Sequence, residues 1–262
     1  MIFKKAILPN ILTLGNLFLG FNAILMVSRG HLLIASWLII VAGILDGLDG
    51  TVARLTNSDS EFGKEIDSLV DTVSFGVAPA ILIYKVIFEP LGLIGFILAF
   101  FPLVAGVSRL ARFNISLPSK SKRKLFKGMP ITSAAGILAS FHIYSVTINA
   151  GSASQVIWFT LTPAVSLLMI SPFPYRRLPV IRVGTARYPH LSVAVLIGVA
   201  LLVLWNPALT LFPLGMAYLI SGPVEYGLLQ LRRVRSQEDD EATTRHIVDG
   251  RRNSPRYRWR KK

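Results

Sequence analysis

The chain has 262 residues, of which 52% are hydrophobic and only 16% are charged, and its mean hydropathy is +0.56. This composition is too apolar for an ordinary soluble protein. The lack of cysteine excludes disulfides, thiolate metal sites and a cysteine nucleophile. The net charge of +14 would suit a nucleic-acid-binding protein, but the basic residues flank apolar stretches, as they do in membrane proteins. We therefore expect contacts with membrane lipids and no nucleic-acid partner.

Apolar stretches of about 20 residues recur along the chain, and each can cross a hydrocarbon core about 30 Å thick. We predict an all-α, polytopic transmembrane helical bundle of about eight spans. The first stretch is expected to be a retained helix, because no small-residue cleavage site follows it. The expected spans are residues 9–28, 31–54, 64–88, 91–112, 131–149, 154–171, 190–205 and 208–231.

The basic residues predict how the bundle is oriented. If the N-terminus is cytoplasmic, all of the 28 lysines and arginines except Arg29 and Lys85 fall in cytoplasmic segments. This distribution follows the positive-inside rule. We therefore expect both termini to face the cytoplasm, together with the adjoining ends of the second and third spans.

Four aspartates at helical spacing lie within 26 positions of this apolar chain, at Asp46, Asp49, Asp67 and Asp71. The first two are three residues apart and the last two are four apart, so each pair shares a helix face. A turn around residues 56–60 would let the two faces converge. Carboxylates at bilayer depth are unfavourable by roughly 2.5–3.5 kcal/mol each and repel one another, so we expect cations among them. Oxygen ligands without histidine or cysteine favour Mg²⁺, Mn²⁺ or Ca²⁺ over Zn²⁺, and four carboxylates suit two ions.

Small and basic residues accompany the carboxylates. Gly50 and Gly63 lack side chains where a bulky ligand would approach the backbone, and Arg54 is a cation suited to phosphate. Taken singly, a carboxylate here could be a proton relay or part of an ion pair, and a glycine could serve helix packing alone. The complete spacing favours a site for metal and phosphate.

From Asp46 to Asp71 the sequence reads D-x-x-D-G-x-x-A-R-x8-G-x-x-x-D-x-x-x-D. This segment resembles the signature of the CDP-alcohol phosphatidyltransferase family at every motif position. The resemblance implies an integral membrane enzyme, commonly a homodimer, with a six-helix core over roughly residues 9–171. Such enzymes move a phosphatidyl group from a CDP-linked lipid to an alcohol and release CMP.

By position, the resemblance also implies a role for each motif residue. The four aspartates would hold two divalent cations, Mg²⁺ or Mn²⁺, and Asp71 would in addition be the catalytic general base. Asn16, inside the first span with Thr13, is expected either to reach the CDP-lipid headgroup or to hydrogen-bond a neighbouring helix. The motif residues expected against the cytidine and its phosphates are Gly50, Ala53, Arg54 and Gly63.

Three further segments concern the acceptor alcohol: Leu8–Gly20, Arg109–Asn114 and Phe126–Pro130. All three look like segments of the membrane-bound phosphatidylserine synthases of bacteria and archaea. The resemblance implies CDP-diacylglycerol and L-serine as substrates and a bacterial or archaeal cell membrane as the location. The mild departures from these relatives are at Met129, Ile131 and Thr132.

A serine site needs a cation, because serine carries a carboxylate. Arg109 and Arg112 are three residues apart at the cytoplasmic end of a span and suit this role, and Asn114 would bind the amine or cap the helix. The same arginines would suit the phosphate of glycerol 3-phosphate or inositol phosphate. They would also follow from the positive-inside rule alone.

The domain organisation is expected to have three parts: a catalytic core at 1–171, two additional spans at 172–231, and a basic, disordered cytoplasmic tail at 232–262. The additional spans, which contain Glu225, are assigned to structural or dimer contacts. A cation transporter with an acidic intramembrane site is the alternative from another class. A transporter would place carboxylates deeper in several spans, whereas here they gather at one end.

Overall fold

The structure is a computed structural model, and it describes residues 3–56, 61–115, 126–175 and 198–252. The regular secondary structure of these residues is helical apart from one pair of two-residue strands, β1 (Phe126–Lys127) and β2 (Pro174–Tyr175), which are antiparallel. Residues 198–205 are also helical. The other elements are α1 (Phe3–Ser28), α2 (Leu32–Thr56), α3 (Glu61–Asp71), η1 (Thr72–Val77), α4 (Ala78–Ile83), η2 (Tyr84–Phe88), η3 (Glu89–Leu91), α5 (Gly92–Ile115), α6 (Ile131–Thr147), α7 (Gly151–Ile170) and α9 (Pro207–Arg252).

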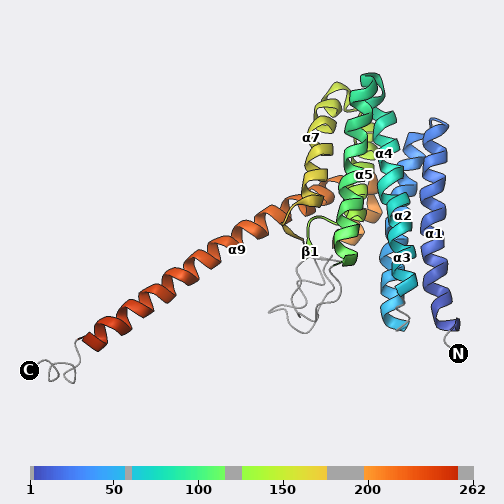
Figure 1. Ribbon diagram of the computed structural model, residues 1–262. Helices are drawn as coiled ribbons and strands as arrows, with labels where there is room; N and C mark the ends of the chain where they lie inside the picture. Colours follow the sequence, from blue (N-terminus) through green and yellow to red (C-terminus); the bar gives the residue numbers. More distant parts are fainter. Residues whose placement is uncertain (1–2, 57–60, 116–125, 176–197, 253–262) are drawn as a thin grey trace, which may run out of the picture. The chain divides into compact units, whose positions relative to one another are not determined.

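Among the described residues, five apolar helical stretches are long enough to cross a membrane, and α6 is a shorter apolar helix. The stretch Phe62–Ile115 has 54 residues and would be about 80 Å long as one straight helix. It folds back at η3, so that α4 and α5 run side by side (Figure 1). The predicted all-helical protein with several membrane spans is confirmed. The five stretches are Ile11–Ser28, Leu32–Val52, Phe62–Ile115, Gly151–Ile170 and Pro207–Leu231.

The third stretch begins as a rod in which α3, η1, α4 and η2 follow end to end (Figure 1). The segments η1 and η2 are π-helical, and η1 begins directly after Asp71. Short π-helical segments inside α-helices occur frequently at functional sites. Ser74 in η1 donates a hydrogen bond of 3.1 Å to the backbone carbonyl of Asn16, which ties the rod to α1 beside Asp71.

The apolar core surrounds α6, most of whose residues are buried. Phe141 packs edge-on against Trp158 of α7, with ring centroids 4.7 Å apart, and against Phe212 of α9 at 4.8 Å. Helix α2 packs against α1 and α6, and α5 packs against α7. Large apolar side chains such as Phe18 and Leu93 point outward, as expected for helices that face lipid.

The chain divides into two compact units, Met1–Gly222 and Pro223–Lys262, with the boundary inside α9. Residues 232–252 of the tail for which disorder was predicted form the last part of α9 and are helical. Mixed charge indicated disorder, but this stretch lacks proline and glycine until Gly250 and contains several good helix formers. Residues 253–262 lie outside the described part of the chain, as does most of the predicted span 190–205.

Candidate active site

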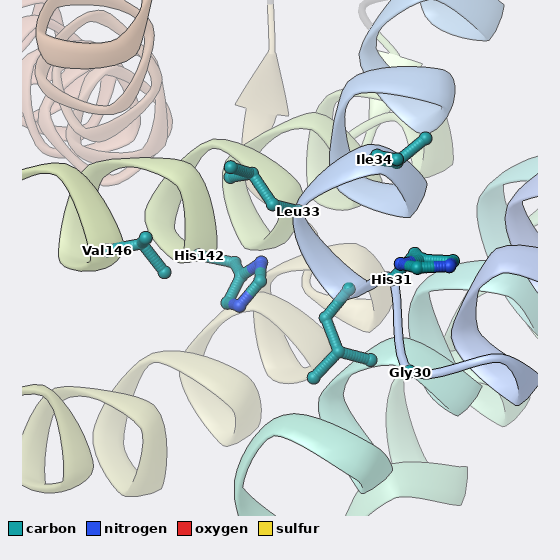
Figure 2. A pocket seen from close by; sticks show the side chains of 7 residues that line it. Gly30, His31, Leu33, Ile34, His142 and Val146 are labelled. Atoms are coloured by element: carbon teal, nitrogen blue, oxygen red, sulfur yellow. The ribbon is translucent and has the colours of Figure 1, made fainter.

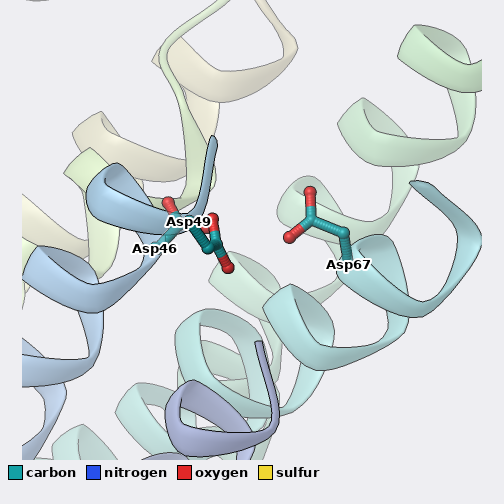
Figure 3. A group of neighbouring side chains, drawn as sticks. All are labelled: Asp46, Asp49 and Asp67. Carbon is teal, nitrogen blue, oxygen red and sulfur yellow. The ribbon is translucent and has the colours of Figure 1, made fainter. Parts of the chain in front are cut away.

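Three aspartates from two helices converge between α2 and α3. Asp46 and Asp49 lie near the end of α2, and Asp67 lies in α3; one carboxylate oxygen of each is within 4.8 Å of the others. Figure 3 shows the carboxylate of Asp67 directed across the gap toward the pair on α2. The spacings of three and four residues in the sequence place these groups on the facing sides of their helices.

Asp71, one turn after Asp67, lies at the inner edge of the same group. Its side chain is only 9% exposed, and it contacts Asp46 and interacts electrostatically with Asp49 and Asp67. Its Oδ1 atom is buried and has no hydrogen-bond partner among the described residues. The structure thus brings all four predicted carboxylates together and leaves one buried oxygen of Asp71 available.

Two threonines orient the carboxylates on α2 from other helices. Thr13 of α1 donates a hydrogen bond of 3.1 Å to Oδ2 of Asp49, and Thr132 of α6 donates one of 3.2 Å to Oδ2 of Asp46. Hydrogen bonds of this kind fix carboxylates that bind metal ions. Sequence reasoning noted Thr132 only as a departure from its relatives, although a hydroxyl in the first turn of an apolar helix was a usable signal.

The carboxylates fit hard divalent cations. Two unit charges 4.8 Å apart repel by roughly 3 kcal/mol at an effective dielectric constant of 20. Oxygens on opposite sides of one ion, with metal–oxygen bonds of about 2.1–2.4 Å, are about 4–5 Å apart. The separation of the three oxygens and the acid-only donor set therefore suit Mg²⁺, Mn²⁺ or Ca²⁺ without a large rearrangement.

Asn16 is a second buried polar group at this site. It is fully buried, and neither Oδ1 nor Nδ2 has a hydrogen-bond partner in the described part of the chain. Asn16 lies one turn after Thr13, so both side chains are on the face of α1 that meets Asp49. An unsatisfied buried amide costs about 1–3 kcal/mol, which a ligand with both donors and acceptors would offset.

The three residues predicted at the acceptor site differ in their surroundings. Arg109 is half-buried; it interacts with Asp71 and Tyr218, and its Nε has no hydrogen-bond partner among the residues described. Arg112 is exposed and donates hydrogen bonds of 3.3 Å to the carbonyls of Ser108 and Ile170. Arg109 thus combines a donor without a partner among the described residues with an electrostatic interaction with Asp71.

Asn114, the third of these residues, lies near the end of α5 and bonds to α3. Its Nδ2 donates a hydrogen bond of 3.1 Å to Oγ of Ser68, which lies beside Asp67 in α3. This contact joins the end of α5 to the helix that carries two of the carboxylates. Asn114 therefore supports the position of α3.

The small motif residues leave room at the end of α2. Gly50 is exposed, and an added Cβ would meet no described atom within 4 Å, so packing does not explain this glycine. Gly63 is half-buried in the first turn of α3. Ala53 and Arg54 lie in the last turns of α2, and their side chains fall outside the described part of the structure.

A cavity of about 360 Å³ lies at the opposite end of α2, roughly 22 Å from Asp46 along the helix (Figure 2). It is lined by residues 30–34, at the start of α2, and by His142 and Val146 of α6. It is therefore separate from the acidic site. Nothing in the sequence had singled out this end of the molecule.

Comparisons with known proteins agree with the site. The CDP-diacylglycerol–serine O-phosphatidyltransferase of Helicobacter pylori strain J99 is 46% identical over 127 residues, 48% of this chain and 53% of that protein. The chain thus matches about half the length of that relative. The Mycobacterium leprae protein of the same name is 34% identical over 227 residues, which cover 83% of this chain and 73% of that protein.

An archaeal protein is similar as well. The archaetidylserine synthase of Methanothermobacter thermautotrophicus is 38% identical over 181 residues, which cover 68% of this chain and 73% of that protein. Residues 6–169, more than half of the chain, match the CDP-alcohol phosphatidyltransferase family model. The matched range contains all four aspartates and Arg109. The chain belongs to the CDP-alcohol phosphatidyltransferase family.

Proposed function

We propose that this protein transfers the phosphatidyl group of CDP-diacylglycerol to the hydroxyl of L-serine, giving phosphatidylserine and CMP. The observation that carries the proposal is the convergence of four carboxylates, with an Asp71 oxygen that has no partner among the described residues and an arginine that interacts with Asp71. Relatives from bacteria that are named for this reaction, and an archaeal relative named for the archaetidyl equivalent, support serine as the acceptor.

In the proposed reaction the hydroxyl oxygen of serine forms a bond to the phosphatidyl phosphorus, and the bond from that phosphorus to CMP breaks. The hydroxyl has a high pKa, so a base must accept its proton as the new bond forms. Asp71 suits this role, because Oδ1 is buried without a partner among described atoms and the carboxylate interacts with Arg109.

The four aspartates would hold two divalent cations, Mg²⁺ or Mn²⁺. Ions bound there supply positive charge that offsets the pyrophosphate and the leaving CMP. The hydrogen bonds from Thr13 and Thr132 would hold Asp49 and Asp46 in position to bind these ions. On the lipid side, the residues proposed to contact CDP-diacylglycerol are Asn16, Gly50, Ala53, Arg54 and Gly63.

Arg109 is proposed to bind the carboxylate of serine. Its guanidinium lies near Asp71, so a bound serine would have its hydroxyl close to the base. Arg112 and Asn114 would contribute less, since both already bond to neighbouring helices. Glycerol 3-phosphate and inositol phosphate are alternative acceptors, because a phosphate would suit the same arginine.

We also propose the topology. Eight spans would comprise a six-helix catalytic core within 1–171 and two more helices within 172–231, followed by a basic tail at 232–262. The positive-inside distribution supports cytoplasmic termini and a cytoplasmic active site in a bacterial or archaeal cell membrane, where serine has access from water. A homodimer is expected from the family resemblance.

An acceptor screen tests the proposal. Purified protein with Mg²⁺ or Mn²⁺ and CDP-diacylglycerol should release CMP when L-serine is added. Release with glycerol 3-phosphate or inositol phosphate, but not with serine, would overturn the acceptor. Metal uptake into proteoliposomes without release of CMP would favour the transporter instead.

A further inference from the structure

Helix α9 presents a stripe of two glycines and a tyrosine to the core. Gly215, Tyr218 and Gly222 follow at intervals of three and four residues and therefore share one face. A Cβ on Gly215 would lie 2.9 Å from Cγ1 of Ile137 in α6, and one on Gly222 would lie 2.3 Å from the ring of Tyr175. Neither position has room for a side chain, so the glycines allow α9 to approach closely and bring Tyr218 inward.

Tyr175 fixes α9 at this position. It lies in β2, opposite Phe126 of β1, and its hydroxyl donates a hydrogen bond of 2.9 Å to the carbonyl of Leu219. Its ring centroid is 5.4 Å from that of Tyr218. Burial, with a further contribution from Tyr218, raises the pKa of Tyr175 to about 12, so its hydroxyl keeps the proton that it donates.

Tyr218 in turn meets the proposed acceptor site. Its side chain hydrogen-bonds that of Ser133 in α6 and interacts with the guanidinium of Arg109. A phenol oxygen can take part in a hydrogen bond with a hydroxyl and also accept one from a guanidinium N–H. Arg109 also interacts electrostatically with Asp71, and its Nε is unpartnered within the described chain. Tyr218, Arg109 and Asp71 thus form a series that ends at the proposed base.

We propose that Tyr218 is a positioning residue, which holds the guanidinium of Arg109 toward the anionic group of the acceptor beside Asp71. The inference rests on the proposed function, because it requires Arg109 to bind the acceptor. Tyr218 lies beyond residues 6–169, where the family match ends. A helix outside the shared core, which the sequence assigned to structural contacts, therefore completes the acceptor site of this chain.

The test is Tyr218→Phe, which keeps the ring against Tyr175 and removes only the hydroxyl. The KM for serine should rise about tenfold, because the guanidinium of Arg109 loses its polar neighbour, while kcat and the KM for CDP-diacylglycerol stay within about twofold. Ser133→Ala, which removes the other partner of Tyr218, should raise the KM for serine by a smaller factor. Tyr226→Phe is the matched control, because Tyr226 lies two turns further along α9 and bonds to Gln230.

The outcomes separate this inference from the proposed function. An unchanged KM for serine in Tyr218→Phe overturns the positioning role. A parallel loss of kcat and of affinity for both substrates, in this variant and in Ser133→Ala, also overturns it, because that result indicates a structural role. If the wild-type protein releases CMP only with a phosphate-bearing acceptor, the serine assignment fails, and the same comparison of KM and kcat with that acceptor decides the role of Tyr218.

Discussion

The buried polar side chains at the two ends of α2 differ in whether they have hydrogen-bond partners. Near its start, Ser36 and His142 bond to each other, with 2.8 Å between Oγ and Nδ1, and the hydroxyl also donates to the carbonyl of Leu32 at 3.0 Å. Near its other end, Asn16 and Asp71 have buried polar atoms without partners among the described residues. Buried polar groups are normally satisfied, so the first end is complete in itself, whereas the second leaves polar atoms that the proposed ligands would satisfy.

The hydrogen bonds near the start of α2 also indicate which ring nitrogen of His142 carries a proton. The serine hydroxyl has one proton, and the carbonyl of Leu32 can only accept it, so Ser36 accepts a hydrogen bond from Nδ1–H of His142. This tautomer is inferred from the hydrogen-bond network. His142 is thereby held between α2 and α6 by bonds to the protein itself, and its place beside the cavity in Figure 2 does not depend on a ligand.

The largest expected effect is that of Asp71→Asn. The amide retains the shape of the side chain but cannot accept the acceptor's proton, so release of CMP should fall by about 10²–10⁴-fold. Thermal unfolding should change little or move upward, because one of four crowded negative charges is removed. Glu89→Gln is the control, since Glu89 is exposed and pairs only with Lys85 among described side chains. Full activity in Asp71→Asn would overturn the assignment of the base.

The next effect is expected from removal of divalent cations, which should affect the end of α2 that carries Asp46 and Asp49. Chelation should abolish release of CMP, and added Mg²⁺ or Mn²⁺ should restore it. Saturating metal at about 100 times its Kd should also stabilise the folded protein by about 2.7 kcal/mol. An Asp46→Asn, Asp67→Asn double variant should lose this stabilisation, which thermal unfolding measures without any assay of activity. Equal stabilisation of the variant would place the ions elsewhere.

Thr132→Val tests whether the hydrogen bond from Thr132 holds Asp46 in position to bind metal. Valine keeps the shape but removes the hydrogen bond to Asp46, so metal affinity should fall about 10–100-fold. Activity should return at higher metal concentration. Thr147→Val is a control in the same helix, because Thr147 bonds only to the carbonyl of Ile143 among the described groups. Unchanged metal dependence in Thr132→Val would mean that Asp46 needs no such support.

The sequence predicted the parts of the site whose geometry is local. Asp46 with Asp49, and Asp67 with Asp71, are close because helical spacing places each pair on one face. The bond between Thr132 and Asp46 spans 86 positions, and no spacing rule connects residues so far apart. The predicted spans likewise followed from local hydrophobicity. The π-helical turns after Asp71 did not, because they depend on how the rod packs against α1.

The same distance along the chain explains why the sequence assigned the last helices to structural or dimer contacts, whereas we propose a role for α9 at the acceptor site. Tyr218 and Arg109 meet only because Gly215 and Gly222 allow α9 to approach α6 and β2. In the sequence these glycines look like ordinary small residues of a membrane helix. Their function becomes visible only when the neighbours Ile137 and Tyr175 are known.

The smallest expected effect on activity is that of Ser36→Ala, at the complete end of α2. The change leaves Nδ1 of buried His142 without its partner, so the free energy of unfolding should fall by about 1–3 kcal/mol. Activity and metal dependence should stay at wild-type values, because Ser36 lies about 15 Å from Asp46 along the helix. Ser28→Ala, which removes an exposed hydroxyl bonded to Leu25, is the control for stability. A loss of activity in the folded Ser36→Ala protein would mean that the two ends of α2 are coupled. The polar groups at the start of α2 could then no longer be called purely structural, in contrast to those proposed to bind ligands at its other end.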